Sequence, residues 1–89
     1  MAKVIVRVKV QDIARWRTAF DAGDSLRQQF GLTVDLVQKD ADEADTVVIV
    51  MSAESMERAR EFSTSDELRQ AQMEAGVIPP PTIWFMDDI

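Results

Sequence analysis

Several residue types that build metal and redox centres are missing from this sequence. It contains no cysteine, no histidine, no tyrosine and no asparagine. Without cysteine the chain forms neither disulfides nor thiolate sites. Without histidine as well, it lacks the usual ligands of zinc and haem centres. Only carboxylates remain as potential metal ligands, and we expect neither a metal nor a cofactor.

Positive charge and long apolar runs are also scarce. The 10 Lys and Arg residues face 16 Asp and Glu residues, which gives a formal net charge of -6. A nucleic-acid-binding protein needs a basic surface, and a membrane span needs roughly 20 consecutive apolar residues. The N-terminus begins directly with a strand pattern and shows no signal-peptide pattern. We therefore expect a cytoplasmic protein that binds neither nucleic acid nor membrane.

What the sequence does contain is a regular alternation of short strand and helix patterns. Its 89 residues, of which 46% are hydrophobic, are enough for one domain spanning 1–89. Valines at every second position of 3–10 predict a strand, and apolar spacing of three to four residues predicts helices. The first half is predicted as a strand at 3–10, a helix at 13–30 between the N-cap Asp12 and Gly31, and strands at 32–39 and 46–51. The second half is predicted as helical pieces that start at Ser55 and Thr64 and end at Gly76, an extended proline connector at 79–81, and a strand at 82–86.

This order, β-α-β-β-α-β, is the split βαβ arrangement of an α+β, ferredoxin-like fold. It predicts a four-stranded antiparallel sheet with the helices on one face. The strands at 46–51 and 82–86 are apolar on both faces, so the face away from the helices would expose a large hydrophobic patch. A C-terminal segment could cover it, but only Asp87, Asp88 and Ile89 follow the last strand. We therefore favour a homodimer that pairs through the sheet face.

Several short motifs resemble a known superfamily. They are Trp16-x-x-x-Phe20 after Asp12, Ala59-Arg60-x-Phe62, Ser65-x-x-Leu68-Arg69, and Ala75-Gly76-Val77 before the proline run. Together they resemble the dimeric α/β-barrel superfamily, near the antibiotic-biosynthesis-monooxygenase-like group of small bacterial proteins. That resemblance implies a ferredoxin-like dimeric α/β barrel. It does not choose an activity, because the superfamily includes cofactor-free monooxygenases, haem-degrading enzymes and lactone isomerases.

A candidate ligand site follows from one face of the first predicted helix. Trp16, Phe20, Gly23 and Arg27 share its apolar arc. Glycine inside a helix costs roughly 1 kcal/mol relative to alanine, so Gly23 would serve close packing or leave room for a ligand. A pocket between helix and sheet with one cation suits a small anionic or aromatic molecule. The simpler interpretation is core packing, with the Arg27 head group reaching out to water.

Arg7 is the other candidate ligand-binding residue. It lies in the middle of the first strand, where a charge needs water or a carboxylate partner. Arg7 would either bind an anionic substrate or pair with an acidic residue such as Asp35 across the dimer, and we favour pairing. The acidic segment 40–45 is interpreted as a solvated hairpin turn, because Asp45 stands where a calcium loop needs glycine.

Three functional hypotheses remain open. The first is a ligand-binding or accessory protein without catalysis. The second is a cofactor-independent monooxygenase or isomerase that acts on an aromatic or quinone-like compound. The third is a structural oligomerisation module. No close pair of carboxylates is evident in the strands, so two-carboxylate acid–base chemistry has no support, and catalytic residues cannot be assigned.

Overall fold

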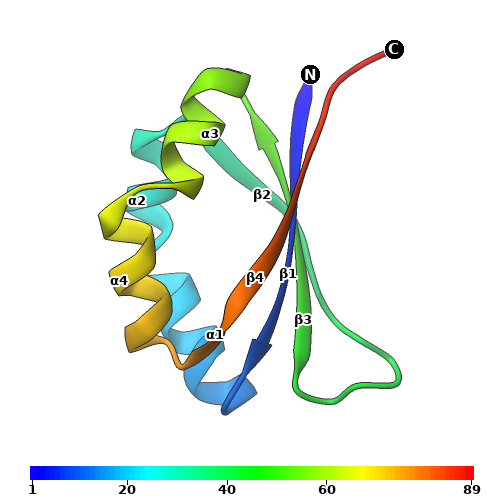
Figure 1. Cartoon of the computed structure of the whole chain (residues 1–89), viewed down its shortest axis with the longest axis vertical. Coiled ribbons are helices and arrows are strands. Elements are labelled where there is room, and N and C mark those ends of the chain that lie inside the picture. Colours follow the sequence, from blue (N-terminus) through cyan, green and yellow to red (C-terminus); the bar gives the residue numbers. More distant parts are fainter.

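The strands form one antiparallel sheet, and all the helices cover a single face of it (Figure 1). The computed structural model describes residues 1–89. The spatial strand order is β2-β3-β1-β4, which places β1 and β3 in the centre and β2 and β4 at the edges. The elements are β1 Ala2–Val10, α1 Ile13–Ala22, α2 Asp24–Gln29, β2 Leu32–Lys39, β3 Thr46–Ala53, α3 Met56–Ser63, α4 Asp66–Glu74 and β4 Val77–Met86. This α+β, ferredoxin-like architecture confirms the predicted fold class.

The core lies between the sheet and the helices. In β1 every second residue from Val4 to Val10 is buried against the helical layer. The strand register places Val6 beside Ile49 of β3 and Ile83 of β4, so one continuous apolar surface crosses the central strands. Trp16 of α1 is buried against it, as is Phe62 of α3. The alternation of valines in β1 therefore predicts the buried face correctly.

The first helical region differs from its prediction, because α1 and α2 are separate helices with Gly23 between them. The Gly23 amide donates to the Phe20 carbonyl at 3.1 Å, which closes the last turn of α1. Glycine has a low helix propensity, and the chain uses it here as a break instead of an interior position. Gly31 does end the second segment, with a φ of 71° that favours glycine.

Strand β2 contains a bulge that its sequence pattern does not reveal. Val34 pairs with Met51 of β3, but Leu36 then pairs with Val50, so Asp35 is the extra residue. An inserted residue shifts the alternation of side chains between the two faces. Leu36 consequently faces away from the helices and Val37 faces towards them, whereas strict alternation from Val34 onwards would place them the other way round.

Two further boundaries are corrected by the structure. The predicted Thr64 cap is wrong, because Ser65 caps α4 by accepting a hydrogen bond from the Leu68 amide at 3.2 Å. The segment 79–81 belongs to β4 and is not a connector. Proline is tolerated in an edge strand, where one side of the backbone needs no hydrogen-bonded neighbour.

No helix covers the second face of the sheet (Figure 1). That face carries exposed hydrophobic side chains. Trp84 and Met86 of β4 pair in register with Ile5 and Lys3 of β1, which places them all on this face. We call this surface the open face. Its large exposed hydrophobic residues are Leu36, Ile78, Trp84 and Met86. No helix in the structure has the length and apolar character that crossing a membrane requires.

Candidate functional site

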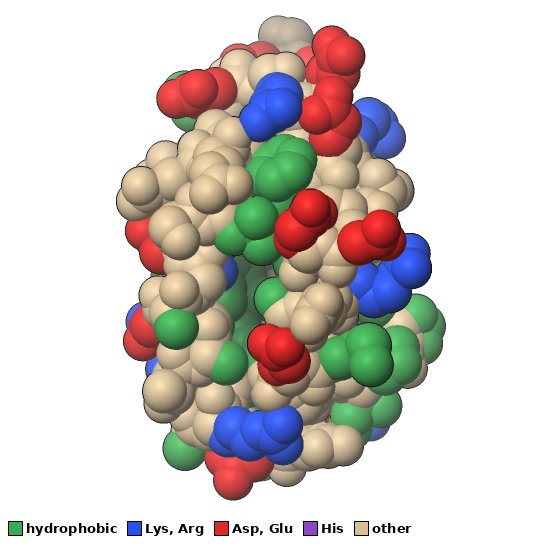
Figure 2. Space-filling view, turned by 90° about the vertical axis from the view of Figure 1, so that its left-hand side faces the viewer, with side chains coloured by type: hydrophobic (Ala, Val, Ile, Leu, Met, Phe, Trp, Pro, Cys, Tyr) green, Lys and Arg blue, Asp and Glu red, His purple; other side chains and the backbone are tan.

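A cavity of about 100 Å³ lies between the helices and the sheet. Figure 2 shows the helix-bearing side of the molecule, where a hollow with hydrophobic side chains inside it opens to the surface. Of the 19 residues that line the cavity, 15 are hydrophobic, and the other four are Gly23, Arg27, Ser63 and Gln72. An engineered cavity of about 150 Å³ is known to hold benzene, so the enclosed part of this one has room for no more than a single ring.

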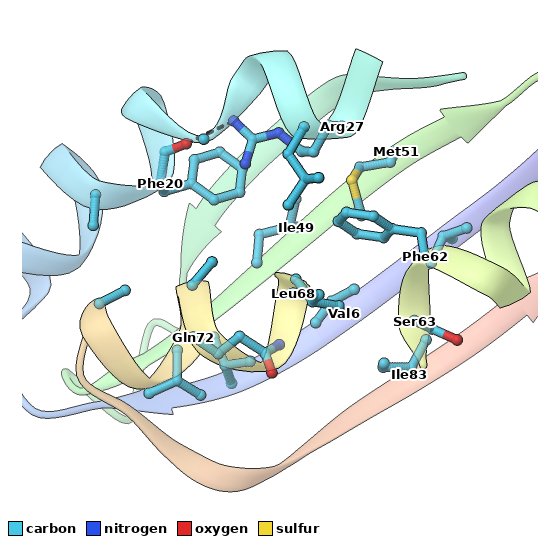
Figure 3. A pocket seen from close by; sticks show the side chains of 18 of the residues that line it. Val6, Phe20, Arg27, Ile49, Met51, Phe62, Ser63, Leu68, Gln72 and Ile83 are labelled. Atoms are coloured by element: carbon cyan, nitrogen blue, oxygen red, sulfur yellow. Dashed lines mark hydrogen bonds between the residues drawn. The ribbon is translucent and has the colours of Figure 1, made fainter. Parts of the chain in front are cut away.

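Four of the five predicted site residues line this cavity: Trp16, Phe20, Gly23 and Arg27. The Trp16 and Phe20 rings stack at a centroid distance of 4.8 Å, as their spacing of one helical turn allows. The Arg27 guanidinium carbon lies 3.9 Å from the centre of the Phe20 ring. The three side chains therefore form one continuous stack along the wall made by α1 and α2. Figure 3 shows the Arg27 guanidinium beside the Phe20 ring.

The Arg27 side chain does not reach out to water, which corrects the simpler interpretation of the sequence. The residue is only 7% exposed. Its Nη2 donates to the Phe20 carbonyl at 2.6 Å and lies 3.5 Å from the Asp24 carboxylate. Phe20 is in the last turn of α1, where the helix dipole attracts cations, and its carbonyl accepts hydrogen bonds from both the Gly23 amide and Arg27. The second lone pair of this carbonyl therefore holds the Arg27 side chain inward.

One donor of Arg27 has no partner. Its Nε is buried and makes no hydrogen bond within the protein. Burial lowers the pKa of Arg27, and the Asp24 carboxylate acts in the opposite direction. Arginine nevertheless remains a cation in proteins. The wall of the cavity therefore includes one positive charge, and the Nε–H group of that guanidinium is enclosed by protein atoms without an acceptor.

The remaining polar lining comes from α3 and α4. The Ser63 hydroxyl donates to the Arg60 carbonyl at 2.8 Å, so it can still accept a hydrogen bond. The half-buried Gln72 amide makes no hydrogen bond within the chain. No Asp, Glu or Lys lines the cavity, so the protein supplies no carboxylate or amine base there. The site can bind and orient an acceptor group, but it holds no evident proton acceptor.

Arg7 lies outside the cavity, on the open face of the sheet. It forms ion pairs with Asp40 at 3.3 Å and with Glu43 at 3.2 Å, in the turn between β2 and β3. Within the chain, Asp35 contacts Lys3 at 2.8 Å and accepts a hydrogen bond from Ser52 at 2.5 Å, so pairing of Arg7 with Asp35 across a dimer stays a prediction. The structure therefore separates Arg7 from the other four predicted residues.

Two aspartates near the open face have lowered pKa values. Hydrogen bonds from Lys3 and then Ser52 lower the pKa of Asp35. The backbone amides of residues 42 and 43 donate hydrogen bonds to the Asp40 carboxylate and lower its pKa. These hydrogen bonds form an Asx turn in the β2–β3 loop. This local geometry agrees with the interpretation of 40–45 as a hairpin turn. No group of three or more His, Cys, Asp or Glu residues is placed to hold a metal ion.

The cavity wall opposite Arg27 contains residues that were not predicted from the sequence. Gln72 stands four residues after Leu68, so helical spacing alone could have placed it on the same face of α4. Ser63 follows the buried Phe62 and could not be assigned in this way. Met51 lines the cavity because it lies on the helix side of β3, in register with Val4.

Solved structures with this fold include proteins named for antibiotic biosynthesis monooxygenases. One from Bordetella bronchiseptica, which carries that name provisionally, has a TM-score of 0.81 and 14% identity over 99% of this chain and 96% of its own. A provisionally named protein from Caulobacter crescentus has a TM-score of 0.75 and 17% identity over 99% and 89% of the two chains.

SnoaB, a cofactor-independent oxygenase from Streptomyces nogalater, has a TM-score of 0.71 and 10% identity, and the match covers 99% of this chain and 94% of SnoaB. No protein-family model and no curated protein matches the sequence. At these identities the similarity establishes the fold and not the activity. The chain therefore has the ferredoxin-like fold of the antibiotic-biosynthesis-monooxygenase-like proteins.

Proposed function

We propose that this protein binds a small aromatic molecule with an anionic oxygen in the cavity between the helices and the sheet. The unpaired, buried Nε of Arg27 is the observation that carries this proposal. A buried donor without a partner costs about 1–3 kcal/mol, and more when it is charged. A ligand oxygen that accepts from Nε removes that cost and also meets the positive charge.

The apolar walls supply the other half of the specificity. The Trp16 and Phe20 rings stack on each other, and the Arg27 guanidinium lies over the Phe20 ring. A planar ligand ring fits such a wall better than a branched aliphatic chain does, because aromatic faces and edges attract one another. The cavity volume of about 100 Å³ favours a single ring over a fused system.

Benzoate is a suitable probe, because it is a single ring with one carboxylate. We expect saturable binding by isothermal titration calorimetry, and at least tenfold weaker binding by Arg27→Met, which loses the charge and the Nε donor. Arg60→Met is the matched control, since Arg60 also covers an aromatic ring, that of Phe85 at 4.5 Å, but does not line the cavity. Equal benzoate affinity in the folded Arg27→Met and Arg60→Met variants would contradict the proposal.

Cofactor-independent oxygenation of an aromatic or quinone-like compound is a second candidate function. The fold likeness to SnoaB, a cofactor-independent oxygenase, favours it. In such a reaction the electrons for oxygen come from the substrate itself. Because no carboxylate or amine base lines the cavity, the substrate would have to arrive already ionised. Oxygen uptake with phenols or quinols across their own pKa tests this candidate, and an absence of uptake above background leaves the binding function alone.

We also infer that two copies pair through the open face. Its large exposed hydrophobic residues lie on the two edge strands, β2 and β4, and soluble proteins rarely leave such a surface in contact with water. Its charges are largely compensated within the chain, since Lys3 pairs with Asp35 and Arg7 with Asp40 and Glu43. A second copy can therefore cover this face without burying several unpaired cations. A purely structural oligomerisation module would dimerise in the same way but would bind no ligand.

A further inference from the structure

Two polar groups stand on opposite walls of an otherwise apolar cavity. Arg27 belongs to α2 and Gln72 to α4, and Figure 3 shows their side chains on opposite sides of the pocket. Ile49 and Leu68 are among the apolar side chains that lie between them in this view. A ligand that spans the cavity would therefore meet a polar group at each end and apolar side chains along its length.

The two polar groups differ in what they can recognise. The Arg27 Nε is a cationic donor, so it selects an acceptor with negative charge. The Gln72 amide offers both a donor and an acceptor, and neither is used within the chain. It can therefore bind a hydroxyl group, which donates and accepts. Ser63, on helix α3, also lines the cavity and keeps an acceptor lone pair.

From this arrangement we infer that the ligand is a single aromatic ring with polar groups at both ends, an anionic oxygen towards Arg27 and a hydroxyl or comparable group towards Gln72. This inference rests on the proposed function, and it adds the number of rings and the second recognition point. Para-substituted aromatic acids and ionised quinols belong to this class.

Three probes of matched shape separate the inference from the proposed function. They are benzoate, 4-hydroxybenzoate and 4-methylbenzoate, where the methyl group has about the size of the hydroxyl but forms no hydrogen bond. We expect the protein to bind 4-hydroxybenzoate roughly three- to tenfold more tightly than 4-methylbenzoate, the contribution of about one hydrogen bond. Isothermal titration calorimetry measures all three dissociation constants.

Two variants of α4 locate the second recognition point. In Gln72→Leu the advantage of 4-hydroxybenzoate over 4-methylbenzoate should disappear, so that the two dissociation constants become equal. In Gln70→Leu the advantage should remain, because Gln70 is exposed and contacts only Glu74, at 3.3 Å. Arg27→Lys should weaken all three probes together, since it retains the charge but lacks Nε.

Different failures have different meanings. If benzoate binds through Arg27 but the hydroxyl and methyl probes bind equally, the second recognition point is wrong and the proposed function stands. A hydroxyl advantage that survives in Gln72→Leu also overturns the inference. If none of the three probes binds to the folded wild-type protein, the proposed function falls and this inference falls with it.

Discussion

At the scale of single residues, Gly23 and Arg27 determine the shape of the candidate site. Gly23 ends α1, and the carbonyl exposed in that last turn holds the Arg27 side chain inside the cavity. The helical period places both residues on the apolar arc, so the sequence predicts their position. It could not predict the direction of the guanidinium, because that depends on the helix break and on the Phe20 carbonyl, which accepts from both the Gly23 amide and Arg27.

Gly23 is expected to tolerate a side chain. Its φ of -88° is accessible to any residue, and an added Cβ would lie 3.5 Å from Arg27 Nη1, an ordinary van der Waals distance. Gly23→Ala should raise the free energy of unfolding by about 0.4–1 kcal/mol, because alanine restricts the unfolded chain. Urea denaturation measures this change.

Gly76 provides the contrasting case. Its φ of 79° disfavours any side chain, and a Cβ would lie 3.4 Å from the Arg15 guanidinium. Gly76→Ala should lower the free energy of unfolding by about 1–2 kcal/mol. A destabilisation by Gly23→Ala as large as that of Gly76→Ala would show that the Gly23 position is tighter than we describe.

At the scale of elements, the sequence predicts every strand and the outer ends of both helical regions, and it fails where one residue changes the local geometry. The alternating valines of β1 and the continuous apolar run of β3 clearly predict strands. The bulge at Asp35 cannot be predicted from the sequence, because its backbone geometry needs no special residue. The prolines of 79–81 predict a connector, because only an edge strand tolerates them. That β4 is an edge strand follows from the strand order and not from the local sequence.

The start of α4 offers a direct test at this scale. Ser65 caps the helix through the Leu68 amide, whereas the Thr64 hydroxyl contacts the carbonyls of Arg60 and Glu61 in the preceding helix. Ser65→Ala should therefore lower the free energy of unfolding by about 1 kcal/mol. Thr64→Ala should lower it by clearly less. Equal losses in thermal or urea denaturation would argue for the cap at Thr64 that the sequence predicts.

The two aspartates of β2 and its loop should make stability depend on pH. Their pKa values are lowered in the folded state, so the deprotonated forms favour folding. That contribution is complete above the unfolded pKa of about 3.9 and disappears as the pH falls through the lower folded values. Urea denaturation between about pH 5 and pH 2 should show falling stability. The Asp35→Asn, Asp40→Asn double variant should lose part of this slope, and an unchanged slope would contradict the assigned hydrogen bonds.

At the scale of the whole molecule, the sequence predicted the architecture but not the cavity. The pattern of strands and helices fixes which faces meet. A cavity depends on how far α1 and α2 stand from α3 and α4 above the sheet, which hydrophobic patterning does not encode. That is why Trp16, Phe20, Gly23 and Arg27 could be placed together from the sequence while Ser63 and Gln72 were missed.

Assembly through the open face predicts that one substitution there separates the copies. Trp84, which is 42% exposed, lies on this face, whereas Met73, which is 73% exposed, lies on α4. Trp84→Glu should weaken self-association about a hundredfold, because buried aromatic residues dominate interfaces. Met73→Glu should leave association unchanged. Sedimentation equilibrium at micromolar concentration tests both variants, and a monomeric wild-type protein would contradict the proposed pairing.

The most direct test of the proposed site is the nuclear magnetic resonance signal of the Arg27 Nε–H group during a titration with benzoate. The account predicts a resolved signal, assigned by its loss in Arg27→Lys, that shifts to lower field and saturates as Nε gains an acceptor. The Arg60 Nε–H signal should stay in place. An Arg27 Nε–H signal that does not move while benzoate saturates the protein would contradict the account.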